Sequence, residues 1–125
     1  MSGIQYPEMR AELARNLSHL ADRSYQERVW VAREFPSDNY YDDFSETYEI
    51  LEDLGVLEKP EACVGVTLKS DAEVYALAGL ALAFVRLFGR YGYKLSDSEY
   101  LAKPEWDDVV AAATIAFVAV TESNP

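Results

Sequence analysis

The sequence predicts an all-α protein, folded as one domain of five to six helices. Three observations support this: helix-start signals recur along the chain, apolar residues repeat at helical spacing, and no linker, internal repeat or low-complexity tract interrupts the 125 residues. A chain of this length that is 50% hydrophobic can bury about two thirds of its unfolded surface in one core. We therefore expect a single helical domain over residues 1–125.

Six helix starts are marked by local sequence. Four carry the capping-box pattern, a Ser, Thr or Asp followed three residues later by Glu: Ser24/Glu27, Asp43/Glu46, Ser70/Glu73 and Ser96/Glu99. Pro7 and Pro104 mark two more, because proline at the first helical position gives up a hydrogen bond that is absent there anyway. Gly55 and either Gly89 or Gly92 are the matching stops.

Apolar periodicity supports the first three predicted helices. Residues 7–21 carry one apolar stripe, and residues 44–54 place apolar side chains on one face and carboxylates on the other. Residues 24–35 also have a helical stripe, but the run at 29–31 suits a strand as well, so helix and strand both remain open there. An amphipathic helix over residues 44–54 would place its carboxylates together on one solvent-facing surface.

The second half of the chain predicts a central helix and a two-faced last helix. Residues 71–90 are apolar nearly all round, as in a buried core helix, and their most apolar run, residues 74–85, is too short to span a bilayer. Residues 104–122 are apolar on both faces, so this helix is either deeply buried or meets another chain. Residues 62–69 are β-prone but isolated, and we expect one short extended connection there.

Negative charge is concentrated in one segment. Residues 37–61 hold nine carboxylates and one lysine, a net −8 in a chain whose net charge is −11. A surface of one sign attracts a partner of the opposite sign and speeds its association. The 11 Lys and Arg residues are scattered, so neither nucleic acid nor an anionic membrane is expected to bind. We expect a basic protein partner.

No familiar catalytic or cofactor motif occurs. Cys63 is the single cysteine and lies in an apolar context, which is typical of a buried structural thiol. His19 is the single histidine, and we expect it to be solvated and to have no role. Nucleophile elbows, phosphate loops and dinucleotide fingerprints are absent, so we expect no enzyme, no cofactor and no metal. The lone cysteine and the charged residues within 1–20, where a signal peptide would be apolar, indicate the cytoplasm.

One carboxylate pattern supports an alternative. Asp42, Asp43 and Glu46 have the DDxxE spacing, and Glu46, Glu49 and Asp53 share a helical face that in larger all-helical enzymes can hold Mg²⁺ against a diphosphate. No second acidic motif and no cluster of Lys or Arg accompanies them. A small Mg²⁺-dependent nucleotide hydrolase is therefore the last of the alternatives.

The candidate partner-binding surface combines carboxylates with aromatic rings. Aromatic residues ringed by polar groups are frequent binding hot spots, although these rings could equally anchor a loop onto the core. The candidate residues are Trp30, Tyr40, Tyr41, Asp42, Asp43, Glu46, Glu49, Glu52 and Asp53. Local capping accounts for Asp43 and Glu46, which leaves Asp42, Glu49, Glu52 and Asp53 unexplained by folding.

Short segments along nearly the whole chain carry a family resemblance: Tyr6-Pro7-Glu8-Met9-Arg10, Leu20-Ala21-Asp22, Tyr25-Gln26, Arg28-Val29-Trp30, Tyr40-Tyr41-Asp42-Asp43-Phe44, and Tyr100-Leu101-Ala102 with Pro104 and Trp106. Together they resemble a family of small bacterial proteins, best known in actinomycetes, for which no activity is established. The central helix departs from that family in being richer in Ala, Leu and Phe. By composition, the chain is also similar to immunity proteins, the cytoplasmic inhibitors that protect a cell from a neighbour's toxin.

Two functional interpretations of different classes follow. The first is an immunity protein or inhibitor that covers the active site or substrate groove of a basic toxin domain, with a nuclease as the expected toxin. The second is a homo-oligomeric helical protein without catalytic activity, which associates through its last helix and uses the acidic face only for solubility.

Overall fold

A computed structural model describes residues 4–122 and confirms the all-α prediction. Its four longer helices are α1 (Pro7–Leu20), α3 (Phe44–Asp53), α4 (Asp71–Tyr91) and α6 (Pro104–Glu122). Four shorter elements complete the fold: α2 (Arg23–Tyr25), the π-helix η1 (Gln26–Val31), the 3₁₀ helix η2 (Pro60–Cys63) and α5 (Asp97–Leu101). Within residues 4–122 the only β pairing is an isolated bridge between Val64 and Leu68.

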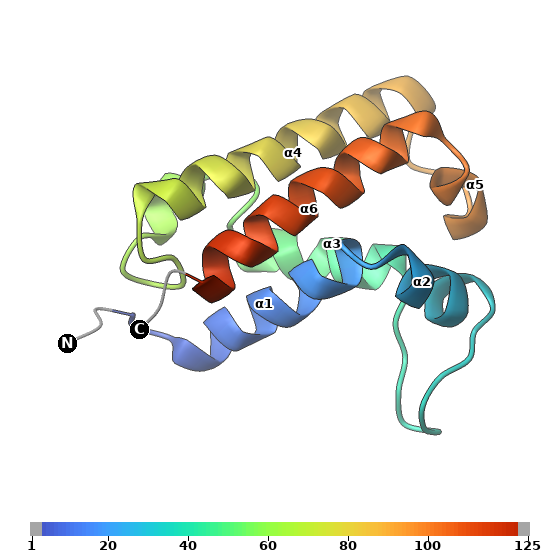
Figure 1. The fold of residues 1–125 in the computed structure, drawn as a ribbon, viewed down its shortest axis with the longest axis horizontal. Helices are drawn as coiled ribbons and strands as arrows, with labels where there is room; N and C mark the ends of the chain where they lie inside the picture. Colours follow the sequence, from blue (N-terminus) through green and yellow to red (C-terminus); the bar gives the residue numbers. More distant parts are fainter. Residues whose placement is uncertain (1–3, 123–125) are drawn as a thin grey trace.

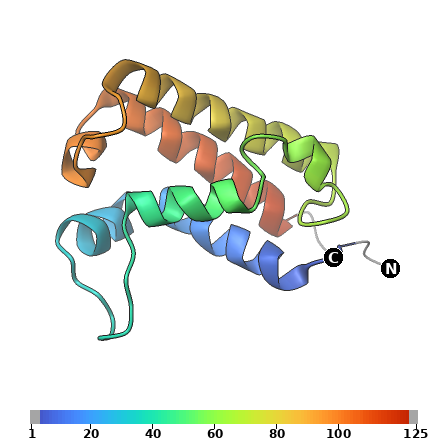
Figure 2. The ribbon, with the colours of Figure 1, turned by 180° about the vertical axis from the view of Figure 1, so that it is seen from behind.

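The long helices form a bundle. Helix α6 lies between α1 and α4 and packs against both (Figure 1). Seen from behind, α3 lies in front of the bundle between α4 and α1, with its own close packing against α1 (Figure 2). A long loop, residues 32–43, leads from η1 to α3 and extends away from the bundle (Figure 2). This arrangement leaves one side of α3 open to solvent.

The core is strongly aromatic where α3, α4 and α6 meet. The ring of Phe44, at the start of α3, lies 4.9 Å from Trp106 at 87° and 5.9 Å from Phe84 in a stacked arrangement. Trp30 of η1 stacks on the same Phe44 ring at 5.9 Å. Each such ring pair contributes about 0.5–1.5 kcal/mol beyond the burial of its apolar surface. Phe44 therefore fixes the start of α3 within the core.

Three of the four predicted capping boxes cap a helix as expected. Ser96 and Glu99 form the full reciprocal box at α5, and Asp43 accepts the backbone N–H of Glu46 at 2.7 Å at α3. Ser70 caps α4, accepting the N–H of Glu73 at 3.5 Å. The fourth box, Ser24/Glu27, is wrong, because α2 begins two residues earlier.

Asp22 provides the cap that was assigned to Ser24. Its Oδ1 accepts the N–H of Tyr25 at 3.0 Å, so the chain turns into α2 directly after α1 ends at Leu20. Gln26 then sits fully buried and donates to the carbonyls of His19 at 2.8 Å and Leu20 at 2.9 Å. Since the last carbonyls of a helix lack partners within it, Gln26 satisfies the end of α1. Residues 24–31 are helical, which resolves the helix-or-strand alternative in favour of helix.

The expected extended connection at residues 62–69 is limited to Val64, which is extended and forms an isolated bridge with Leu68. The chain forms η2 and then a tight loop, in which the carbonyl of Cys63 accepts the N–H groups of Val66, Thr67 and Leu68 at 2.9–3.0 Å. Gly65 has a φ of 86°, in the left-handed region that is unfavourable for residues with a Cβ atom. The loop is held from outside by Gln5, whose N–H donates to the carbonyl of Gly65 at 2.9 Å.

A buried ion pair joins this loop to α1, α4 and α6. Glu73 is fully buried and receives two hydrogen bonds from Arg10, at 2.8 and 2.9 Å, and one from the backbone N–H of Lys69 at 2.8 Å. Arg10 also donates to the carbonyls of Thr67 at 2.8 Å and Val120 at 2.7 Å. One guanidinium thus ties together three parts of the chain that are distant in sequence.

Helix α4 is longer than its most apolar run. Its 21 residues are long and apolar enough, by length and composition alone, to cross a membrane, although the core helix of a globular protein meets the same criterion. In this fold α4 packs against α6 along its length and buries Leu77, Leu80, Phe84 and Leu87. The expectation of a central helix buried nearly all round is therefore wrong: α6 lies between α1 and α4, and α4 buries one face while Leu82 and Val85 stay exposed on another.

Candidate functional site

Helix α3 presents a row of carboxylates to solvent. Phe44, Thr47 and Leu51 are buried against the bundle, and the opposite face carries the exposed side chains of Glu46, Glu49, Glu52 and Asp53. In the described part of the chain none of these four forms a salt bridge with Lys, Arg or His. We call these four residues the acidic face. It is the part of the predicted surface that the structure places as expected.

Tyr41 and Asp43 lie at the edge of the acidic face and hold one another. The Tyr41 hydroxyl donates to Asp43, and this hydrogen bond raises the pKa of Tyr41. The Tyr41 side chain is 50% exposed, but the guanidinium of Arg33 lies 5.1 Å from its ring centre and 5.3 Å from that of Phe35. Tyr41 is therefore accessible, although a cation of the same chain occupies part of its ring.

Two of the predicted surface residues are buried, which corrects their assignment to a partner-binding surface. Trp30 is 2% exposed and Asp42 is 4% exposed. Asp42 accepts hydrogen bonds from the Trp30 indole at 2.8 Å, the Tyr25 hydroxyl at 2.8 Å and the Thr47 hydroxyl at 3.1 Å. The physical reason is that Asp42 precedes the cap of α3 and points inward, where it satisfies donors that would otherwise be buried alone.

His19 belongs to the same network, so the expectation that it is solvated is wrong. Its Nδ1 lies 3.2 Å from Oδ2 of Asp42, and its ring packs 4.0 Å from the ring of Tyr25. Tyr40 is half-buried, and its hydroxyl lies 2.5 Å from that of Tyr25. Tyr40 thus anchors the loop and is a weaker candidate for contact with a partner than Tyr41.

Opposing effects set the pKa values in this network. Burial on its own would raise the pKa of Asp42, but its contacts with His19, Trp30, Tyr25 and Thr47 outweigh burial and hold that pKa below the usual value. Burial, followed by the bond to Tyr40, raises the pKa of Tyr25. The hydrogen bonds from Trp30, Tyr25 and Thr47 thus favour the ionised form of Asp42, which suits a structural role in holding the loop.

The DDxxE carboxylates do not converge. Asp42 points into the core, Asp43 caps α3, and Glu46 is exposed on the acidic face. Among residues 4–122, no group of three or more His, Cys, Asp or Glu side chains is placed to hold a metal ion. The alternative of a Mg²⁺-dependent hydrolase thus finds no geometry here to support it.

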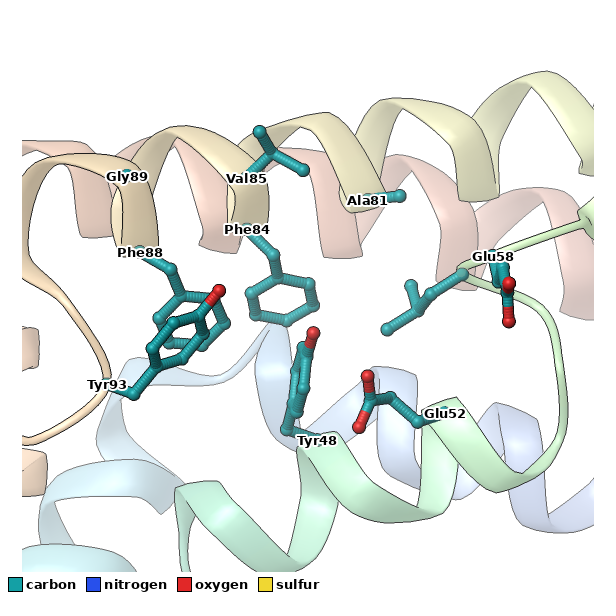
Figure 3. Close-up of a pocket in the computed structure, with 10 residues that line it drawn as sticks. Tyr48, Glu52, Glu58, Ala81, Phe84, Val85, Phe88, Gly89 and Tyr93 are labelled. Carbon is teal, nitrogen blue, oxygen red and sulfur yellow. The ribbon is translucent and has the colours of Figure 1, made fainter.

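A groove that sequence reasoning missed lies beside the acidic face, between α3 and α4. Its larger part is a cavity of about 410 Å³, shown in Figure 3. Tyr48 and Glu52 rise into it from α3, Phe84 and Phe88 reach down from α4, and Tyr93 stands beside Phe88. The Tyr48 ring centre is 5.0 Å from that of Phe84 and 5.2 Å from that of Phe88. Aromatic side chains therefore bridge the two helices and form the walls of the groove.

A second cavity of about 240 Å³ continues the groove toward α5 and shares Tyr48, Glu52, Phe88 and Tyr93 with the first. Together the two cavities are lined by four carboxylates, Glu49, Glu52, Glu58 and Asp97. Among the described residues that line them, none is Lys, Arg or His. We call these two cavities the aromatic groove.

Burial and nearby charges shift the pKa of two residues that line the groove. Burial, followed by the nearby charge of Glu52, raises the pKa of Tyr48 to about 12. Burial also raises the pKa of Asp97, and Asp43, which lies outside the groove, adds to that rise. The N–H of Phe44, which donates to Asp97 at 3.1 Å, and the charge of Arg33 oppose it. An added positive charge would relieve this repulsion.

The last helix has two faces, as predicted, and the outer one is open. Trp106, Val109, Ala113, Ala116 and Val120 are buried, while Ile115 and Val118 are 63% and 41% exposed. On the adjacent helix α4, Leu82 is 48% exposed. Of the two alternatives for this helix, deep burial on both faces is therefore wrong for the single chain.

The fold and the candidate site define a small all-α bundle with an acidic helix beside an aromatic groove. A family model described as a domain of unknown function, DUF7945, matches residues 4–125, so the chain belongs to this family. No curated protein and no solved structure is a significant match to the chain. The match confirms the resemblance to a family without an established activity across nearly the whole chain.

Proposed function

We propose that this protein is an inhibitor of the immunity-protein type, which binds and neutralises a basic toxin domain through the acidic face of α3. The observation that carries the proposal is that Glu46, Glu49, Glu52 and Asp53 are exposed together and that none of them, in the described part of the chain, is neutralised by a salt bridge. Like charges held at helical spacing repel one another, so an uncompensated row is retained at a cost in stability. A cationic partner would offset this repulsion, and its attraction to the four carboxylates would favour the complex.

The mechanism we propose is occlusion. A nuclease carries Lys and Arg where it contacts phosphates, and carboxylates spaced along a helix can occupy those cations in place of the nucleic acid. Tyr41, exposed at the end of the row, would supply an aromatic contact at the edge of the interface. The same proposal places the protein in the cytoplasm of a bacterium of the actinomycete type, where an immunity protein would meet its toxin.

The test uses the product of a neighbouring gene, if that gene encodes a large secreted protein with a basic C-terminal domain. Association of that domain with this protein is followed by stopped-flow at low and high salt. The variant Glu46→Lys/Asp53→Lys should lower the on-rate about tenfold or more at low salt, because steering depends on local charge. The matched control is Asp108→Lys/Glu122→Lys, which reverses two exposed carboxylates on α6 and changes the net charge by the same amount; it should change the on-rate little. Equal on-rates for both variants would refute the proposal.

The second candidate function, self-association without catalysis, is favoured by the open outer face of α6. Ile115 and Val118 of α6 and Leu82 of α4 are exposed, and these two helices pack side by side (Figure 1). Apolar side chains gathered in this way are typical of an interface. Sedimentation velocity at micromolar concentration distinguishes the two: a dimer that Ile115→Lys dissociates supports self-association, and a monomer counts against it.

A further inference from the structure

We propose that the aromatic groove binds the cationic side chain of an arginine or lysine supplied by the basic partner. This inference rests on the proposed function and deepens it, because it names the part of the partner that is recognised and where it binds. The acidic face would attract the partner, and the groove would hold one side chain. Four observations support this assignment.

The first observation is the arrangement of the rings. Tyr93 is 79% exposed at the mouth of the groove, and its ring centre lies 4.8 Å from that of Phe88 (Figure 3). Tyr48 meets Phe88 edge-on at 83°, so the two ring planes form a corner. A cation within about 6 Å of such ring faces is attracted by their negative charge density. The corner beside an exposed tyrosine therefore suits a guanidinium or ammonium group.

The second observation is charge. Glu52 and Glu58 line the larger cavity, and Glu49, Glu52 and Asp97 line the smaller one. Lys59 and Lys94 lie next to Glu58 and Tyr93 in the chain, but neither lines the groove. An anion would be repelled here, and a neutral apolar ligand would leave Glu49, Glu52 and Glu58 without a counter-charge. The charge complementarity selects a cation.

The third observation is the apolar floor. Leu57, Ala81, Phe84 and Val85 line the larger cavity together with the two carboxylates. Arg and Lys carry three or four methylene groups below the charge, and these pack favourably on apolar surface while the charged end stays near water. A bare metal ion would gain nothing from this floor, whereas a long basic side chain uses both parts of the groove.

The fourth observation is position. Glu49 and Glu52 belong to the acidic face and also line the groove, so a partner drawn to α3 has the groove within reach. The larger cavity, about 410 Å³, falls in the range of about 300–1,000 Å³ that is usual for ligand sites. One interface would thus combine long-range attraction with a specific anchor.

The test uses a defined peptide, acetyl-Gly-Arg-Gly-amide, and the same peptide with citrulline, a neutral isostere of arginine. Binding is followed by the aromatic ¹H–¹³C signals of the protein in low salt. We expect the arginine peptide to move the signals of Tyr48, Phe88 and Tyr93 in a saturable way and the citrulline peptide to leave them in place. Equal shifts with both peptides, or shifts confined to other rings, would overturn the inference.

The chain offers a closely matched pair of variants. Tyr93→Ala removes an exposed ring from the groove, and Tyr75→Ala removes one from α4 outside it; the two side chains are 79% and 77% exposed, so neither change should disturb the core. Tyr93→Ala should weaken the arginine peptide about two- to fivefold, as expected for an exposed cation–π contact, and Tyr75→Ala should not weaken it. Unchanged affinity in Tyr93→Ala would refute the groove as the site.

The two proposals fail in different measurements. The on-rate of the basic domain with Glu46→Lys/Asp53→Lys reports on the acidic face, and neither residue lines the groove. The peptide experiment with Tyr93→Ala reports on the groove alone. If the on-rate falls but Tyr93→Ala binds peptide normally, the acidic face is kept and the groove is rejected. A normal on-rate of Glu46→Lys/Asp53→Lys, with peptide binding weakened in Tyr93→Ala, keeps the groove and rejects the inhibitor.

Discussion

Asp42 and Glu49 lie seven residues apart in the same acidic segment, yet one is buried and the other is exposed. Asp42 is 4% exposed and accepts three hydrogen bonds from buried donors, whereas Glu49 is exposed and has no salt bridge within the described residues. Glu73 in α4 is also buried, and it accepts hydrogen bonds from Arg10. A count of carboxylates therefore overstates the charge that is available to a partner.

Buried and exposed carboxylates differ in the hydrogen-bond donors that their removal would leave unsatisfied. Removing a buried carboxylate strands the donors that surround it, so such residues hold the fold together even where the net gain from the pair is small. Removing an exposed one leaves only water and lowers the repulsion among its neighbours. Binding is therefore expected to depend on the exposed set and stability on the buried set.

The strongest test of this division compares Glu73→Ala with Glu49→Ala. Glu73→Ala leaves the Arg10 guanidinium buried without its carboxylate and should lower the free energy of unfolding by about 3–5 kcal/mol. Glu49→Ala should change it by less than about 0.5 kcal/mol. Urea denaturation of both variants, followed by circular dichroism, measures the two values. A similar loss in both would show that burial does not separate these carboxylates.

The second test is Asp42→Asn, which keeps the shape of the side chain but removes its charge. The amide must place an NH₂ among the hydroxyl and indole donors, so we expect a loss of about 2–3 kcal/mol at pH 7. Urea unfolding of wild type and variant measures it.

The pH dependence of that loss has a definite sign. The pKa of Asp42 is lowered in the folded state, so its charge contributes stability that is fully present above the unfolded pKa of about 3.9 and is lost as the pH falls through the folded value. The stability difference between wild type and Asp42→Asn should therefore shrink below about pH 4. A difference that stays constant into the acid range would mean that the charge of Asp42 contributes nothing.

The acidic face was predictable and the Asp42 network was not, for a physical reason. Residues 44–54 follow a regular helical period, so the outward direction of Glu46, Glu49 and Asp53 follows from spacing alone. Asp42 lies in an irregular loop, where no period assigns a side to the residue. The burial of Trp30 likewise depends on Phe44 and Trp106, which reach it only in the folded chain.

Competing local signals explain the other differences. Asp22 and Ser24 are both suitable N-cap residues. Asp22 caps α2 because α1 ends at Leu20, just before it. Residues 62–69 have β propensity but no strand to pair with, and the carbonyl of Cys63 instead gathers the N–H groups of a tight loop. The aromatic groove could not be predicted from the sequence, because Tyr48, Phe88 and Tyr93 come together only when α3 faces α4.

The smallest expected effect concerns Glu52, which is exposed and yet influences a half-buried group. Burial and the charge of Glu52 raise the pKa of Tyr48 from the ordinary 10.0 to about 12. Glu52→Gln should lower that pKa while burial, the larger cause, keeps it above 10.0. The ¹³C signal of the Tyr48 ring, titrated in wild type and variant over the pH range in which circular dichroism shows both folded, measures the change. If the two titrations coincide, Glu52 does not act within the groove, and the charge that would attract a cation must come from Glu49, Glu58 and Asp97.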